Sequence, residues 1–277
     1  MSEPIACVIG WPVSHSRSPT IHRFWLESLG IAGDYILQPV EPETIASFFA
    51  SFADAGFVGC NVTVPHKEAA FAAVDVLEPA AEALGALNTI WLDDRKLVGT
   101  STDGYGFLAN LDQNAPGWDA EPGPAVILGA GGASRAVVWA LLSRGFAPVH
   151  IVNRTVERAQ ALATAFGSDV RPAAWSDLQG LLPAAKILVN ATSLGMVGQP
   201  DLNVDLDGLS TTVVVNDLVY VPLETGLLAD ARERGVRTVD GLGMLLHQAV
   251  PGFERWFGAR PEVTPALRAA VVATLDE

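Results

Sequence analysis

Short runs of apolar and β-branched residues alternate along this chain with alanine-rich stretches of helical periodicity. The runs read IACVIG, GCNVTVP, PAVILGAG, PVHIVNRT, KILVNAT and TTVVVND. Parallel strands cannot be joined by a tight turn, so this rhythm predicts parallel sheets with helices on their faces. The expected fold class is therefore α/β.

The length of the chain predicts two domains. It has 277 residues, of which 49% are hydrophobic, so it can bury a sizeable core. The rhythm is broken at 114–124, where NAPGWDAEPGP contains three prolines and two glycines. We interpret this stretch as a surface connection between the domains.

The charge balance excludes several classes of partner. The formal net charge is −14 and no Lys/Arg cluster compensates for it, so neither nucleic acid nor an anionic membrane is an expected partner. The N-terminal stretch MSEPIACVIG lacks a basic region, and no run of about 18 apolar residues occurs, which predicts a cytoplasmic protein. An anionic ligand must therefore be held by a local device.

The cysteines and histidines show no metal-ligand spacing. Cys7 and Cys60 each lie in an apolar segment without a CxxC or histidine partner, so packing is expected rather than a disulfide or a metal site. The five histidines likewise have no carboxylate or cysteine at ligand spacing. We expect no metal.

The stretch VILGAGGASRA at 126–136 predicts a dinucleotide site. An apolar strand runs into Gly129, Gly131 and Gly132, and a helix continues to a stop at Gly145. Such a turn lets a pyrophosphate approach the backbone at a helix N-terminus. Ser134 replaces the third glycine of GxGxxG, and its small side chain still permits close packing. Taken alone, the loop could also be a plain connector.

The end of the next strand indicates which dinucleotide is bound. An NAD-binding domain usually places an acid there, whereas this chain has Asn153, Arg154, Thr155 and Arg158. A guanidinium can form a fork onto phosphate oxygens, so Arg154 favours the 2′-phosphate of NADP. The alternative is that Thr155 caps the helix and Arg158 lies on a solvated face.

A second anion site is indicated near the N-terminus, in SHSRSPTIH at 14–22. Ser18 and Pro19 form an N-cap and N1 pair, which places the hydroxyls of Ser16 and Ser18 beside a helix N-terminus that favours a carboxylate. Capping without a ligand would account for Ser18 but not for Ser16.

Polar residues also follow apolar strands in the first half. The strand NVTVPHK is expected to end at Pro65 and to present His66 and Lys67. Further polar groups at strand ends are Asn61, Thr63, Asn88, Thr102 and Asp103. Open α/β sheets bind ligands beyond the carboxyl ends of their strands, so these groups are expected to cluster. A lone lysine after a strand is more often a surface residue, and Lys67 gains interest only if Asp103 converges with it.

The motifs HSRSP, NVTVPHK, ALNT, STDG, GAGGASR, NRT, NATSLGM and DGLGMLLHQA occur in this order from about Ser14 to Gln248. Together they resemble the shikimate dehydrogenase family. The resemblance implies a substrate-binding and catalytic domain at 1–103 with 242–277. It also implies a Rossmann-type, doubly wound NADP-binding domain at 104–241, and a cleft between the two domains.

The resemblance also implies roles for individual residues. Lys67 and Asp103 would be the catalytic pair. The substrate-binding residues would be Ser16, Ser18, Asn61, Thr63, Asn88, Thr102, Tyr220 and Gln248. The cofactor-binding residues would be Gly129, Ala130, Gly131, Gly132, Ala133, Asn153, Arg154, Thr155, Arg158, Thr192, Ser193, Gly241 and Met244. Ser101 and Val221 depart from the usual family pattern, where Asn is common at both positions.

The implied reaction is the NADP-dependent, reversible reduction of 3-dehydroshikimate to shikimate in aromatic amino-acid (chorismate) biosynthesis, by a monomer or homodimer. A quinate/shikimate dehydrogenase of broader specificity is an alternative, although Ser18, rather than threonine, favours shikimate. A non-catalytic NADP-binding sensor is a second alternative, which the joint presence of Lys67, Asp103 and Gln248 disfavours.

Overall fold

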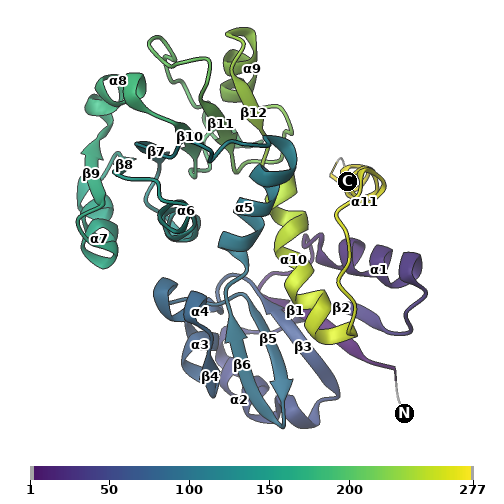
Figure 1. Cartoon of the computed structure of the whole chain (residues 1–277). Coiled ribbons are helices and arrows are strands. Elements are labelled where there is room, and N and C mark those ends of the chain that lie inside the picture. The colour runs from purple at the N-terminus through teal and green to yellow at the C-terminus, as the bar shows by residue number, and fades with distance from the viewer. Residues whose placement is uncertain (1–2, 276–277) are drawn as a thin grey trace. The chain divides into compact units, whose positions relative to one another are not determined.

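The computed structural model describes residues 3–275, which form two compact units. The first unit comprises residues up to Thr102 together with residues from Leu246 onward, and the second is Asp103–Leu245. The assignment of substrate to the first unit and of cofactor to the second stays a prediction. Figure 1 labels the helices and strands of both units.

The first unit is built on a mixed six-stranded sheet with strand order β2-β1-β3-β5-β6-β4. Its strands are β1 Ile5–Gly10, β2 Asp34–Pro39, β3 Phe57–Val62, β4 Val76–Leu77, β5 Thr89–Asp93 and β6 Lys96–Thr100. The expectation of purely parallel strands is wrong here, because β5 pairs antiparallel with both β3 and β6. Asp94 and Arg95 have φ of 44° and 65°, so they form a tight hairpin turn that needs no crossover helix.

The helices of the first unit are α1 Ser18–Leu29, α2 Ile45–Ser51, α3 Lys67–Ala73, α4 Pro79–Leu84 and α11 Pro265–Val272, and α10 Leu242–Phe257 continues into it from the second unit. The core confirms the packing role of the cysteines, since Cys7 and Cys60 are fully buried, reduced, and paired in register on β1 and β3.

The C-terminal segment is tied to the rest of the first unit by two tryptophans. The indole N–H of Trp25 donates to the carbonyl of Glu262 (2.9 Å), and that of Trp256 donates to the carbonyl of Ile90 (2.9 Å). Gly59 makes room for the second indole, because a Cβ at this position would lie 1.9 Å from Nε1 of Trp256. The segment from Leu246 is therefore part of this core.

The second unit has a parallel six-stranded sheet with strand order β12-β11-β10-β7-β8-β9, the doubly wound arrangement predicted from the sequence. Its strands are β7 Ala125–Leu128, β8 Val149–Asn153, β9 Val170–Ala174, β10 Ile187–Asn190, β11 Val214–Asp217 and β12 Arg237–Val239. Its helices are α5 Asp103–Asn114, α6 Gly132–Ser143, α7 Val156–Phe166, α8 Leu178–Leu181 and α9 Gly226–Glu233. Successive residues of β7 enter two different core clusters, so both faces of the sheet are buried.

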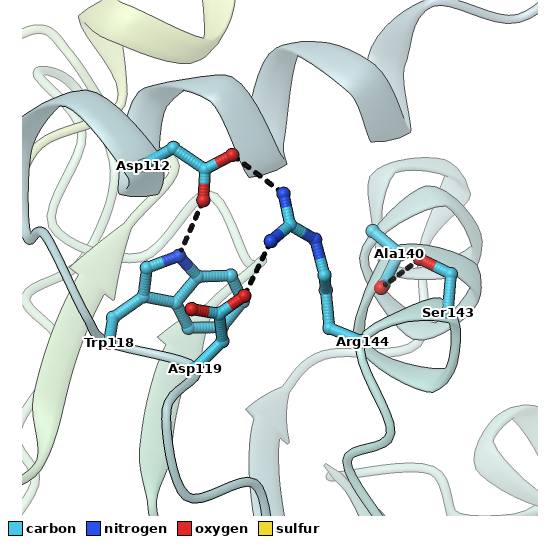
Figure 2. A network of polar contacts seen from close by, with 6 residues as sticks. All are labelled: Asp112, Trp118, Asp119, Ala140, Ser143 and Arg144. Atoms are coloured by element: carbon cyan, nitrogen blue, oxygen red, sulfur yellow. Dashed lines mark hydrogen bonds and ion pairs between the residues drawn. The ribbon is translucent and has the colours of Figure 1, made fainter.

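The proline- and glycine-rich stretch 114–124 was predicted to connect the domains, and this prediction is wrong. The stretch lies between α5 and β7, inside the second unit. Figure 2 shows how it is anchored: Arg144 donates to the carboxylates of Asp112 (2.6 Å) and Asp119 (2.5 Å), and the indole of Trp118 donates to Asp112 (2.9 Å). Side-chain contacts from α5 and from the end of α6 thus hold it.

Candidate functional site

The glycine loop follows β7 in the second unit. Gly129 has φ of +104°, and a Cβ there would lie 2.8 Å from Cγ2 of Thr192, so both the backbone conformation and the close neighbour require glycine. The hydroxyl of Ser134 is fully buried, donates to the carbonyl of Gly129 (2.9 Å) and accepts from the N–H of Gly131 (3.1 Å). Ser134 therefore holds the turn together, a role that the sequence did not reveal.

The surface of this loop is suited to an anion. Helix α6 begins at Gly132, and the N–H groups of a first helical turn have no partner within the helix. A Cβ placed on Gly131 or Gly132 would meet nothing within 4 Å, Ala133 is exposed, and the first turn contains no acidic residue. The loop can therefore receive a phosphate group without steric or charge conflict.

The residues after β8 present positive charge to solvent. Arg154 and Arg158 are exposed, and within residues 3–275 neither guanidinium has an ion-pair partner. Asn153 donates through Nδ2 to the carbonyl of Thr155 (2.7 Å), which fixes the turn into α7. Thr155 occupies the N-cap position but its side chain makes no capping hydrogen bond, so capping does not account for this residue.

The remaining predicted cofactor residues of the second unit lie after β10 and after β12, and the predicted substrate residue Tyr220 lies after β11. Thr192 donates through Oγ1 to Oδ1 of Asn190 (2.7 Å), whereas Ser193 is exposed. Gly241 packs against the turn after β11, where a Cβ would lie 2.2 Å from the carbonyl oxygen of Leu218. Met244 packs against the core of this unit, and Tyr220 is half-buried.

One buried carboxylate lies between these two loops. Asp217 is fully buried, and burial raises its pKa, while hydrogen bonds from Thr225, Val219 and Asn190 act in the opposite direction. Nothing in the sequence marks Asp217 beyond its place at the end of an apolar run.

In the first unit, two serine hydroxyls meet at the start of α1. The helix begins at Ser18 with Arg17 as N-cap, so the prediction that Ser18 is the N-cap is wrong. Ser16 instead accepts the N–H of Ser18 (3.3 Å) and donates to its hydroxyl (3.2 Å), which brings both hydroxyls together at the positive end of the helix dipole.

Asn61 belongs to a buried polar cluster, but most of its hydrogen-bonding capacity is used within the protein. Its Nδ2 donates to the carbonyl of Asn88 (3.1 Å) and to Oγ1 of Thr89 (3.1 Å), and its Oδ1 accepts from the hydroxyl of Tyr35 (2.6 Å). Burial raises the pKa of Tyr35, which keeps this hydroxyl a donor. Tyr35 was missed because it lies within β2 and belongs to no motif, and Thr89 was missed although it ends the ALNT motif, because only its neighbour Asn88 was assigned a role.

The structure brings together three of the predicted substrate residues around Asn88. Its Oδ1 accepts from the backbone N–H (2.9 Å) and the hydroxyl (3.1 Å) of Thr102, and its Nδ2 donates to Oε1 of Gln248 (3.3 Å). Residues 88, 102 and 248 are distant in sequence, so the fold itself creates this group of hydrogen-bonding side chains.

The predicted strand end before Lys67 is displaced in the structure. Strand β3 ends at Val62, and Lys67 is the first residue of α3, so the prediction that the strand continues to Pro65 is wrong. His66 is buried and its Nε2 lies 2.7 Å from the carbonyl oxygen of Val40, which gives this ring a structural contact. Lys67 and Thr63 are half-buried, and Asp103 opens α5 in the other unit.

Two kinds of feature are absent from residues 3–275. In that range no three or more His, Cys, Asp or Glu side chains are grouped so as to hold a metal ion. No helix described there combines the length and the apolar character that crossing a membrane requires.

Three family models match the chain. They are described as shikimate dehydrogenase substrate binding domain (residues 8–90), shikimate / quinate 5-dehydrogenase (117–197) and shikimate 5′-dehydrogenase C-terminal domain (241–271). Their ranges fall in both compact units.

Similar proteins cover nearly the whole chain. Shikimate dehydrogenase (NADP(+)) of Azorhizobium caulinodans is 56% identical over 268 residues, 97% of this chain and 95% of that protein. The crystal structure of shikimate 5-dehydrogenase from Thermus thermophilus with NADP(H) and shikimate has a TM-score of 0.85 at 37% identity and covers 98% and 99% of the two chains. Quinate dehydrogenase from Corynebacterium glutamicum with NAD has a TM-score of 0.89 at 30% identity, with the same coverage.

Proposed function

The chain belongs to the shikimate dehydrogenase family, and from this membership we propose that it catalyses the reversible, NADP-dependent reduction of 3-dehydroshikimate to shikimate in aromatic amino-acid biosynthesis. The observation that carries the proposal is the hydrogen-bonding group of Asn88, Thr102 and Gln248 in the first unit, which suits a ring bearing several hydroxyls. A monomer or homodimer in the cytoplasm is part of the same proposal.

The proposed binding groups for the anionic parts of the substrate and the cofactor lie in different units. The two hydroxyls of Ser16 and Ser18 at the N-terminus of α1 would hold the substrate carboxylate. In the second unit, the backbone N–H groups at the start of α6 would hold the pyrophosphate, and Arg154 with Arg158 would hold the 2′-phosphate. In a chain with a net charge of −14, these local groups are what makes binding of anions favourable.

Lys67 and Asp103 would supply the acid-base chemistry. NADPH supplies the hydride when it is bound, and the protein contributes position and electrostatics. The carbonyl oxygen of the substrate gains negative charge as its carbon is reduced, and an ammonium group at Lys67 would stabilise that charge and donate the proton. Asp103 would orient the lysine for this step.

The decisive experiment crosses shikimate and quinate with NADP⁺ and NAD⁺ and compares the four kcat/KM values from absorbance of the reduced nicotinamide. We expect the highest value with shikimate and NADP⁺. Comparable values with quinate would favour the broader specificity, for which the similarity to a quinate dehydrogenase is the motivation. Absence of turnover with every pair would refute the proposed function and favour a sensor.

The role of Lys67 is tested by Lys67→Met, with Lys96→Met as the matched control because Lys96 is an exposed lysine on the same unit. Loss of a general acid lowers kcat about 10²- to 10⁴-fold, so we expect a fall of this order for Lys67→Met and none for the control. A Lys67→Met enzyme with wild-type kcat at saturating shikimate would refute the assignment.

A further inference from the structure

The buried carboxylate of Asp217 has no role in the chemistry proposed above. It lies at the carboxyl end of β11 with 0% exposure, and within the described residues its partners are three donors, none of them cationic. Its Oδ1 accepts from Nδ2 of Asn190 (2.8 Å) and from the N–H of Val219 (3.0 Å), and its Oδ2 accepts from the hydroxyl of Thr225 (2.7 Å). Burying a carboxylate without a counter-charge is unfavourable, so a role that needs it there is indicated.

The first of these hydrogen bonds fixes the orientation of the Asn190 amide. Both hydrogens of Nδ2 are used, on Asp217 and on the carbonyl of Leu194 (3.2 Å), while Oδ1 accepts from the N–H (3.0 Å) and the hydroxyl (2.7 Å) of Thr192. An acceptor at position 217 allows only this orientation, because a flipped amide would turn its oxygen toward the carboxylate. The orientation in turn fixes the loop 190–194.

This loop contacts the glycine turn. The hydroxyl of Thr192 also accepts the N–H of Leu194 (3.1 Å), and the methyl group of Thr192 fills the space that a Cβ on Gly129 would need. A continuous chain of contacts therefore runs from the Asp217 carboxylate through Asn190 and Thr192 to the loop suited to the pyrophosphate.

The other two hydrogen bonds fix the segment after β11. The N–H of Val219 is held one residue before Tyr220, and the carbonyl of Val219 accepts the N–H of Gly241 (3.3 Å). Thr225 is the N-cap of α9, and its hydroxyl accepts the N–H of Leu228 (3.4 Å) while donating to Asp217. One carboxylate thus restrains both ends of the segment 217–225 as well as the neighbouring loop.

We propose that Asp217 is a positioning residue that holds the loops 190–194 and 217–220 in the one arrangement that accepts the nicotinamide half of NADP. The inference rests on the proposed function, in which residues at the end of β8 hold the adenosine phosphate. The loops after β10 and β11 lie on the other side of β7 in the sheet, which leaves them to the nicotinamide half. The adenosine half would depend on residues 153–158, from the end of β8 onward, and in the described residues none of these is a hydrogen-bond partner of Asp217. The two halves of the cofactor should therefore respond differently to a change at position 217.

The test compares Asp217→Ala with Asp217→Asn in the full-length protein. We expect Asp217→Ala to lower kcat and raise KM for NADP⁺, each by about tenfold or more, because hydrogen bonds to a charged group are lost. The affinity for adenosine 2′,5′-bisphosphate, measured by calorimetry, should stay at the wild-type value. Asp217→Asn keeps an oxygen for Asn190 and Val219, and the hydroxyl of Thr225 can turn to accept from the new amide, so this variant should recover most of the activity.

Two results would overturn the proposal. One is an Asp217→Ala protein with wild-type kcat and KM, and the other is a folded Asp217→Ala protein that loses affinity for adenosine 2′,5′-bisphosphate as strongly as for NADP⁺. Should Asp217→Ala fail to fold, a comparison of Thr225→Val, which removes the donor to Asp217, with Thr225→Ser, which keeps it, replaces that test. A Thr225→Val enzyme with wild-type kcat and KM would refute the proposal. Failure of the proposed function itself would look different, because the wild-type protein would then not turn over shikimate. In that case the role of Asp217 is still tested by comparing the affinities of wild type and Asp217→Ala for NADP⁺ and for adenosine 2′,5′-bisphosphate.

Discussion

His22 should make the stability of this protein fall as the pH is lowered from neutrality. The imidazole on α1 is fully buried, stacks on the ring of Tyr35 at 4.0 Å, and neither ring nitrogen has a hydrogen-bond partner in the described part of the chain. Burial lowers the pKa of His22 to about 3, although the side chain of the neighbouring Asn61 acts in the opposite direction without reaching hydrogen-bond geometry. The ring is therefore neutral in the native state throughout the physiological range.

The size of the effect follows from linkage. Unfolding releases His22 into water with a pKa of 6.5, so below that pH the unfolded state binds a proton that the native state does not bind until pH 3. Each pH unit in this window lowers the free energy of unfolding by about 1.4 kcal/mol. Between pH 7 and pH 5 the loss from His22 alone is about 2 kcal/mol.

The measurement is urea unfolding of wild type and His22→Phe, monitored by tryptophan fluorescence at pH 7, 6 and 5. Phenylalanine keeps the stacking on Tyr35 and cannot titrate, so the variant should lose about 2 kcal/mol less than wild type between pH 7 and pH 5. His150→Gln is the matched control. Burial also lowers the pKa of His150, but this residue is only half-buried. The free energy of unfolding of His150→Gln should therefore vary with pH almost as that of wild type does. Equal losses for His22→Phe and wild type would refute the reasoning.

Three further substitutions test other contacts. Tyr35→Phe removes the donor to Oδ1 of Asn61, so we expect a loss of about 1–3 kcal/mol in urea unfolding and a raised KM for shikimate with KM for NADP⁺ unchanged. Arg144→Met removes the two ion pairs that anchor the stretch after α5, which should cost about 1 kcal/mol at low salt and less at 1 M NaCl. Gly59→Ala places a Cβ against the indole of Trp256, which should cost about 1–3 kcal/mol and lower the thermal midpoint by about 2–12 °C, and a variant as stable as wild type would contradict the packing described.

The parts of the fold that depend on local backbone chemistry were predictable. Six strands, β1, β3, β7, β8, β10 and β11, were visible because apolar β-branched runs are local signals, whereas β2, β4, β5, β6, β9 and β12 were not predicted. The glycine turn was visible because Gly129 must adopt a positive φ. The hairpin at Asp94 and Arg95 was missed, because neither residue is the glycine that usually marks two successive positive φ angles.

The parts of the site that depend on long-range contacts were not predictable. Tyr35 reaches Asn61 across a sheet, and Asp217 meets Asn190 on a neighbouring strand; neither has a sequence neighbour that would reveal the contact. The serine pair shows the same limit at close range, since Ser16 and Ser18 are two residues apart and only the geometry shows that Ser16 accepts the N–H of Ser18.

The return of the C-terminal segment to the first unit has a consequence for the order in which the protein is made. The second unit, Asp103–Leu245, is complete as a sequence before residue 246 is added, so it can fold while synthesis continues. The first unit cannot complete its core until Trp256 and Glu262 have been synthesised. All six strands of its sheet have been synthesised by then, and part of their apolar surface is still uncovered. During this interval the surface of β3 and β5 that Trp256 of α10 covers in the folded protein is exposed on the nascent chain.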